Sequence, residues 1–184
     1  MLTLYILLGI IAALVLWLIL AYNGLVRLRQ QAREAESDID VQLKRRFDLI
    51  PNLVETVKGY ASHERQTLEG VTEARTRFMS AKNTKEQIAA NDFLSNTLKT
   101  LFAVSENYPD LKANANFLDL QRELADTENK IQAARRFYNA NVRDLNIRTE
   151  QFPANIVAGA FRFARMEYFE AEAPGEREAV KVDF

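Results

Sequence analysis

Residues 2–21, LTLYILLGIIAALVLWLILA, contain no charged side chain, and Thr3 is the only clearly polar one. An α-helix rises about 1.5 Å per residue, so a segment of this length matches the roughly 30 Å hydrocarbon core of a bilayer. A helix also satisfies its own backbone hydrogen bonds in lipid, where water is absent. The sequence therefore predicts a membrane anchor over residues 1–22. The predicted anchor residues are Leu4, Leu8, Leu14, Trp17, Leu20 and Tyr22, the aromatic ones near the membrane surface.

A cleaved secretory signal is the main alternative for this segment. Such signals carry a basic n-region, an apolar core of about 7–15 residues and a small-residue cleavage site. Here no Lys or Arg precedes the apolar run, the run is longer, and the bulky Ile19 stands at the −3 position of a cut after Ala21. A buried core helix is a further alternative, which the position at the extreme terminus disfavours. We therefore expect an uncleaved spanning helix.

The charges that flank the anchor predict its orientation. Arg27, Arg29 and Arg33 follow the span before the first acidic residue, Glu34, whereas only the terminal amine lies on the other side. Positive charge accumulates on the cytoplasmic side of membrane proteins. We therefore expect the N-terminus outside and the large C-terminal part in the cytoplasm. The absence of cysteine is consistent with that reducing compartment.

The composition of the remaining chain is typical of long helices. Six Gly and four Pro occur in 184 residues, and Ala, Leu, Glu, Gln and Arg are abundant. The 24 basic and 25 acidic residues give a net charge of −1, which excludes the basic footprint of a nucleic-acid-binding protein. At this length we expect one domain outside the membrane.

The apolar residues after the anchor recur at intervals of three and four, which is the pattern of helices packed along a seam. The first helix is predicted to continue from the anchor to about Arg46, and a second to extend from about Ile50 to Ser80. Between them Pro51 disfavours helical geometry in the preceding residue. We expect a tight turn here with Asp48 as N-cap, and a kinked continuous helix is the alternative. The first seam comprises Leu25, Leu28, Ala32, Ala35 and Ile39, then Leu43 and Phe47.

Two further long helices are predicted from capping signals. Asn83 or Thr84 caps the third helix, and NYPD at residues 107–110 ends it, with Asp110 capping the fourth. A short fifth helix is expected to begin near Asn155. The fourth helix carries the most regular stripe: Phe117, Leu120, Leu124, Thr127, Ile131, Ala134, Tyr138, Asn141 and Leu145.

These elements predict an all-α fold, in which the N-terminal transmembrane helix continues into an antiparallel up-and-down bundle of about four long helices. Short connections leave neighbouring helices no other way to pack. The bundle is predicted over residues 23–170. An acidic, flexible tail is predicted over residues 171–184, where the terminal VKVDF has the composition to pair with the edge of a sheet.

Two stretches of the chain resemble the LemA family. DVQLKRRFDLIPNLVETVKGYASHE lies within residues 22–75, and RRFYNANVRDLNIRTEQFPANIVAGAFRF covers residues 135–163. The resemblance implies a single-pass protein of the bacterial inner membrane with the N-terminus outside. It also implies an up-and-down helical bundle and a partner in membrane proteolysis or envelope stress. It implies no activity, since the family's molecular function is unsettled.

The sequence offers no catalytic set, so we predict no enzyme, no cofactor and no metal site. His63 is the only histidine and lacks the second histidine of a metalloprotease helix. Cysteine nucleophiles, glycine-rich phosphate loops and a G-x-S-x-G motif are absent. A carboxylate-based hydrolase or transferase using Asp38, Asp40 and Asp48 is the least favoured alternative.

Two groups of residues are candidates for an interaction surface. The first is a charged collar, Lys44, Arg45, Arg46 and Asp48. These side chains either cap and form ion pairs with one another on a solvated helix face, or they contact a partner at the membrane-distal tip of the bundle. The second is an aromatic strip within residues 152–169, which either completes the bundle core or forms an association surface. The strip comprises Phe152, Phe161, Phe163, Tyr168 and Phe169.

From these features we predict a non-enzymatic scaffold in the membrane. It would form homo-oligomers in the lipid bilayer and organise partner membrane proteins, because tethering raises the effective concentration of its copies. A membrane-shaping or stress-sensing protein is the alternative, and it requires the same assembly.

Overall fold

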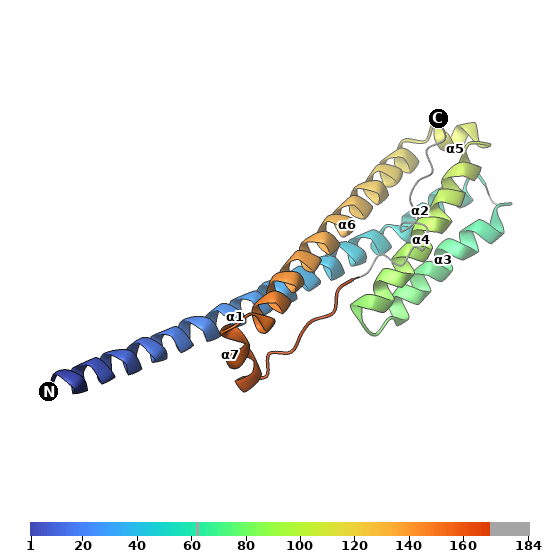
Figure 1. Ribbon diagram of the computed structural model, residues 1–184. Coiled ribbons are helices and arrows are strands. Elements are labelled where there is room, and N and C mark those ends of the chain that lie inside the picture. The colour runs from blue at the N-terminus through green and yellow to red at the C-terminus, as the bar shows by residue number, and fades with distance from the viewer. Residues whose placement is uncertain (62, 170–184) are drawn as a thin grey trace, which may run out of the picture. The chain divides into compact units, whose positions relative to one another are not determined.

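The computed structural model describes residues 1–61 and 63–169 (Figure 1). In these residues the regular secondary structure is entirely helical, which confirms the predicted all-α class. The predicted tail, residues 171–184 with VKVDF, lies outside the described residues. The helices are α1 (Leu2–Asp48), α2 (Ile50–Lys58), α3 (Arg65–Ser80), α4 (Thr84–Ser105), α5 (Pro109–Lys112), α6 (Ala115–Glu150) and α7 (Ala154–Ala160).

The helices form two compact units. One unit is Gln30–Tyr138, which holds the C-terminal part of α1, the helices α2 to α5, and the N-terminal part of α6. The other unit combines Met1–Arg29 with the described residues from Asn139 onward, including α7. The helix α1 is unbroken from Leu2 to Asp48, as the sequence predicts.

The unit Gln30–Tyr138 is an up-and-down helical bundle. The rings of Phe47 on α1 and Phe78 on α3 stack with their centroids 4.1 Å apart, and Phe102 on α4 meets Phe117 on α6 edge-on at 6.0 Å. The predicted seams face inward, since burial of apolar surface drives helix packing. The seam positions of α1 in this unit are all buried: Ala32, Ala35, Ile39, Leu43 and Phe47.

The tight turn predicted at Pro51 is wrong, and the alternative, a kinked helix, is correct. Only Leu49 separates α1 from α2, and its backbone is helical at φ −78° and ψ −20°. The Leu53 amide still donates to the Leu49 carbonyl at 3.1 Å. Pro51 lies in the first turn of α2. Backbone N–H groups in a first turn have no partner within their own helix, so proline is tolerated there. Asp48 is the last residue of α1 and does not cap α2.

The chain reverses later than predicted, between α2 and α3, so the single helix predicted from Ile50 to Ser80 is wrong. Gly59 ends α2, and the described residues before α3, 59–61 and 63–64, are not helical. Tyr60 is therefore exposed rather than part of a continuous stripe. Side chains hold this reversal to the segment between α4 and α6: Tyr108 Oη donates to Glu64 at 2.9 Å, and Asn114 Nδ2 donates to Tyr60 Oη at 3.0 Å.

The caps of the later helices confirm one prediction and correct another. Asn83 Oδ1 accepts a hydrogen bond from the Glu86 amide at 2.9 Å, so Asn83 caps α4 as predicted. Asp110 lies in the short helix α5 and caps nothing. Asn114 takes its place, because its Oδ1 accepts from the Phe117 amide at 3.0 Å in the first turn of α6. The predicted α6 stripe is buried or half-buried at every position.

Candidate functional site

Residues 2–20 of α1 are not covered by any other described part of the chain. Every residue from 2 to 20 is exposed, and α1 is the one described helix that is long and apolar enough to cross a membrane. Burial begins at Ala21 and Leu25. Such a surface requires an apolar environment, which indicates a membrane anchor. The predicted anchor residues are exposed as follows: Leu4 53%, Leu8 54%, Leu14 61%, Trp17 36%, Leu20 63% and Tyr22 36%.

An aromatic cluster lies at the point where the exposed part of α1 ends. The Tyr22 ring meets Phe161 edge-on at 4.8 Å and Phe163 at 5.8 Å, and the Arg29 guanidinium lies 4.8 Å from the Phe163 centroid. Phe163 is only 9% exposed and belongs to a small core with Leu25. Edge-to-face rings and a cation over a ring are both favourable arrangements. The chain after α7 is thereby attached to the base of the anchor.

The segment after Phe163 is attached to α6 by two asparagine side chains. Asn146 Nδ2 donates to the Met166 carbonyl at 2.9 Å, and the Met166 amide donates to Asn146 Oδ1 at 3.0 Å. Asn139 holds the backbone of Phe169 in the same two-bond manner, at 2.8 and 2.9 Å. We call Asn139 and Asn146 the asparagine clamp. Each side-chain amide donates one hydrogen bond to the carbonyl of one residue and accepts one from the N–H of the same residue. A neighbouring β-strand forms the same two bonds.

The spacing of the asparagine clamp follows from two backbone geometries. Seven residues of helix, from Asn139 to Asn146, advance about 10 Å. Three extended residues, from Met166 to Phe169, cover about the same distance. Neither asparagine was predicted as a site residue. The signal available was two asparagines one heptad apart on α6, each able to face the same side of the helix.

The predicted aromatic strip therefore has two parts. Phe163 is buried in the core and Phe169 is half-buried, with its backbone held by Asn139. The other three rings are exposed: Phe152 76%, Phe161 51% and Tyr168 43%. Ile156 in α7 adds a further exposed apolar side chain at 62%. Phe163 thus lies in the core of its own unit, and a role of the exposed rings in association stays a prediction.

The four residues of the charged collar lie in two different environments, one exposed and one buried. Lys44 and Asp48 pair along α1 at 3.5 Å, and Arg45 pairs with Glu123 of α6 at 2.8 Å, all on exposed side chains. Arg46, however, is 3% exposed, so its assignment to a surface collar is wrong. Arg46 lies three residues after the buried Leu43, so it shares the inward face of α1. These residues lie beside the α1–α2 kink and not at a chain reversal.

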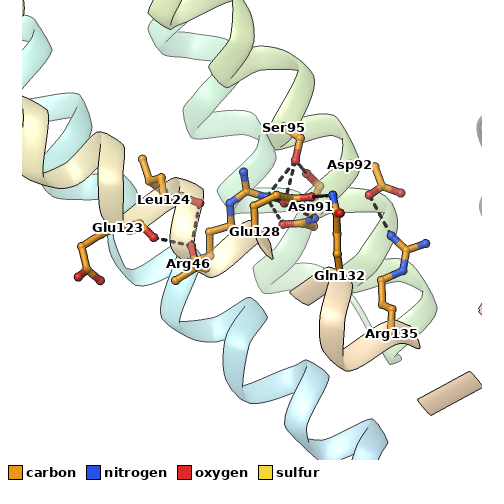
Figure 2. A network of polar contacts seen from close by, with 10 residues as sticks. Arg46, Asn91, Asp92, Ser95, Glu123, Leu124, Glu128, Gln132 and Arg135 are labelled. Carbon is orange, nitrogen blue, oxygen red and sulfur yellow. Dashed lines mark hydrogen bonds and ion pairs between the residues drawn. The ribbon is translucent and has the colours of Figure 1, made fainter. Parts of the chain in front are cut away.

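Arg46 is the centre of a buried polar network that joins α1, α4 and α6 (Figure 2). Its Nη1 donates to Asn91 Oδ1 at 2.6 Å and to Ser95 Oγ at 2.9 Å, and it forms an ion pair with the Glu128 carboxylate. Asn91 Nδ2 and Gln132 Nε2 donate to Glu128 at 3.3 and 3.0 Å. Asn91 is fully buried, and the Glu128 side chain is 23% exposed. We call these residues the Arg46 network.

The Arg46 network stabilises the charged forms of both Arg46 and Glu128. Burial by itself raises the pKa of Glu128, but attraction to Arg46 and hydrogen bonds from Gln132, Asn91 and Ser95 outweigh it, so that pKa lies below the ordinary value. Burial lowers the pKa of Arg46, and the charge of Glu128 opposes this. Arginine nevertheless stays charged in proteins. The result is a fixed ion pair rather than a group prepared to exchange protons, and such a pair selects one arrangement of helices.

The depressed pKa of Glu128 predicts acid sensitivity. A carboxylate whose folded pKa lies below its unfolded pKa, about 4.3 for Glu, stabilises the fold above that value, and this contribution is lost as the pH falls through the folded pKa. We expect Glu128→Gln to lower the free energy of unfolding at neutral pH and to flatten its decline below about pH 4.3. Urea titrations followed by far-UV circular dichroism at several pH values measure this. An unchanged pH profile would contradict the assignment.

Comparison with known proteins assigns the chain to a family. The family model of the LemA family matches residues 35–184. Protein LemA of Metamycoplasma hominis is 30% identical over 168 residues, which cover 88% of this chain and 73% of the relative. Magnetosome protein MamQ 1 of Paramagnetospirillum magneticum is 24% identical over 192 residues, covering 90% of this chain and 71% of the relative. Magnetosome protein MamQ of Magnetospirillum gryphiswaldense is 23% identical over the same coverage. The family match and the LemA relative agree with the resemblance in the sequence, and the chain belongs to the LemA family.

Proposed function

We propose that this chain is a non-enzymatic, membrane-anchored scaffold that associates with copies of itself and organises other membrane proteins. The observation that carries the proposal is the continuity of α1. One helix supplies both an exposed apolar span and the buried seam of the bundle. A tether on a flexible linker would only concentrate a protein at the membrane, whereas a continuous helix allows contacts between bundles to arrange the anchors.

The buried polar groups of the bundle support a structural role. In the Arg46 network the carboxylate of Glu128 accepts hydrogen bonds from its neighbours and pairs with a fixed cation. Of the predicted carboxylate set, Asp48 pairs with Lys44 on the surface. Burial raises the pKa of Asp40, which a hydrogen bond from Thr84 opposes, and Asp38 is exposed. This spread gives little support to a carboxylate-based enzyme.

The location proposed for the scaffold is the bacterial inner membrane, with the N-terminus outside and the bundle in the cytoplasm. The arginines after the anchor favour this orientation. A membrane protease or a stress-response protein is the kind of partner that we propose, on the basis of the resemblance to the LemA family. Relatives named magnetosome proteins are consistent with work at a membrane but do not specify a partner.

Self-association is the testable core of the proposal. Because the chain has no cysteine, a single substitution at the exposed Lys82 provides a unique labelling site in the α3–α4 connection. We expect donor- and acceptor-labelled Lys82→Cys protein, reconstituted together in vesicles, to show energy transfer that survives dilution with lipid. An excess of unlabelled wild-type protein should abolish the transfer, which controls for random proximity. Transfer that vanishes on dilution would show monomers and would remove the scaffold proposal.

A membrane-shaping protein is the second candidate, favoured by the exposed Phe161 ring beside Tyr22. Electron microscopy of the same vesicles separates the two candidates. A scaffold is expected to leave vesicle diameter unchanged at all protein densities, whereas tubes or a narrow distribution of small vesicles would favour membrane shaping.

A further inference from the structure

We propose that the chain makes a second contact with the lipid surface, through the α7 surface, defined here as Phe152, Ile156 and Phe161. The inference depends on the anchor spanning the bilayer and is independent of self-association. It assigns an occupant to an exposed apolar surface for which the described residues provide no cover.

The α7 surface lies at the depth where the anchor leaves the membrane. Residues 2–21 account for about 30 Å of helix, so Tyr22 marks the edge of the hydrocarbon core. The Phe161 ring centroid is 4.8 Å from that of Tyr22, which is less than one helical turn. Figure 1 shows α7 beside α1 within this unit. The exposed apolar surface of the anchor therefore continues onto Phe161, the residue that directly follows α7.

The sequence of this segment is unlike that of a solvated surface helix. Residues 152–161, FPANIVAGAF, contain no charged side chain, although 27% of the whole chain is charged. Ala154, Val157 and Ala158 are buried against the unit's core. The remaining residues point outward, and all of them are exposed: Phe152, Pro153, Asn155, Ile156, Gly159, Ala160 and Phe161. A helix that is uncharged on its outer face as well as its inner one requires a second apolar environment.

The turn that ends α7 carries an arginine where glycine is usual. The Phe163 amide donates to the Ala158 carbonyl at 2.9 Å and the Arg162 amide to the Gly159 carbonyl at 3.3 Å, which is a Schellman cap. Arg162 has a φ of 55°, in the left-handed region that glycine adopts most easily. Its side chain is exposed and has no ion-pair partner among the described residues. The cap therefore fixes the backbone of Arg162 and leaves its guanidinium exposed next to Phe161 in the sequence.

A lipid headgroup is the partner that fits this arrangement. Arginine binds phosphate through its planar set of donors, and interfacial segments combine an apolar face with basic flanks. Arg162 directly follows the uncharged segment, and before it stand Arg148 and Glu150, the latter already paired with Arg165 at 3.0 Å. A second copy of the chain or a partner protein would also cover apolar residues, but neither explains why the surface lies directly against Tyr22. The α7 surface is thus an interfacial wedge beside the spanning helix.

The test measures the depth of Ile156 in vesicles. The full-length Ile156→Cys protein is labelled with an environment-sensitive fluorophore and reconstituted at low protein density. The matched control is Met79→Cys on α3, whose native side chain is similarly exposed at 69%. We expect phospholipids spin-labelled on their acyl chains to quench the label at position 156 several-fold more than that at 79. Iodide in the aqueous phase should show the opposite preference.

Two further variants keep the result interpretable. Phe161→Ser in the Ile156→Cys background should reduce lipid quenching while far-UV circular dichroism stays unchanged, because the Phe161 side chain is exposed. Arg162→Gly preserves the fold at this position, because glycine adopts the left-handed backbone easily. If anionic lipid increases the lipid quenching of the label at position 156, this variant should remove that increase. Equal quenching at positions 156 and 79 would overturn the proposal. Protection from iodide that grows with protein density, without lipid quenching, would overturn it in favour of a second copy. Neither result depends on the energy-transfer experiment.

Discussion

Arg46→Met is expected to destabilise the bundle by about 3–5 kcal/mol, because it leaves the partly buried Glu128 carboxylate without its counter-ion. The substitution keeps most of the apolar volume of the side chain, so the loss reports on charge and hydrogen bonding rather than on a cavity. Asn91, fully buried, also loses its partner at 2.6 Å. Urea titration of the full-length protein in a mild detergent, followed by far-UV circular dichroism, measures the effect.

The neighbouring pair provides a matched control. Arg45 and Glu123 lie on the same two helices and form an ion pair with Nη2 and Oε2 2.8 Å apart, but their side chains are about half exposed. Arg45→Met is expected to cost about 1 kcal/mol or less, since exposed ion pairs contribute little. In a double-mutant cycle, Arg46→Met combined with Glu128→Gln should cost less than the sum of the single changes. Additive costs would show that Arg46 and Glu128 do not act together.

Asn146→Ala is expected to release the segment that follows Phe163. The substitution removes both hydrogen bonds to the Met166 backbone at a site where Asn146 is 4% exposed. Two net hydrogen bonds correspond to about 2–3 kcal/mol of local stability. Hydrogen exchange at the Met166 amide should therefore accelerate by roughly 30- to 150-fold, at 1.4 kcal/mol for each factor of ten.

Asn139→Ala is the companion variant, because Asn139 makes the same two bonds to Phe169 from a half-buried position. We expect it to accelerate exchange at Phe169 and to leave Met166 protected. Unfolding of the Gln30–Tyr138 unit should not change in the Asn146→Ala variant, since the clamp lies outside that unit. Unchanged exchange at Met166 would show that the aromatic contacts of Phe163 hold the segment without Asn146.

The helical seams could be predicted because each is a local pattern. Leu25, Ile39 and Phe47 follow the 3–4 period, and all are buried. The cap of α4 could be narrowed to Asn83 or Thr84, because a capping side chain bonds to a backbone amide two or three residues away, and Asn83 is the one that caps. The position of the chain reversal was not a local property. Pro51 permits a turn or a kink, and the apolar stripe of α2, which packs on the same core as α1, favours the kink.

By itself, the sequence determined the long apolar helix at the N-terminus, the all-α class and the buried faces of the long helices, because length, composition and period decide where apolar surface can go. The tertiary structure alone decided that Arg46 is buried while Arg45 is exposed. It also decided that Phe163 is core while Phe161 stays exposed, and that two asparagines hold a segment 20 and 30 residues further along the chain. These outcomes depend on which part of the chain lies opposite each side chain in the folded protein. The contacting residues are distant in sequence, so no local pattern predicts them.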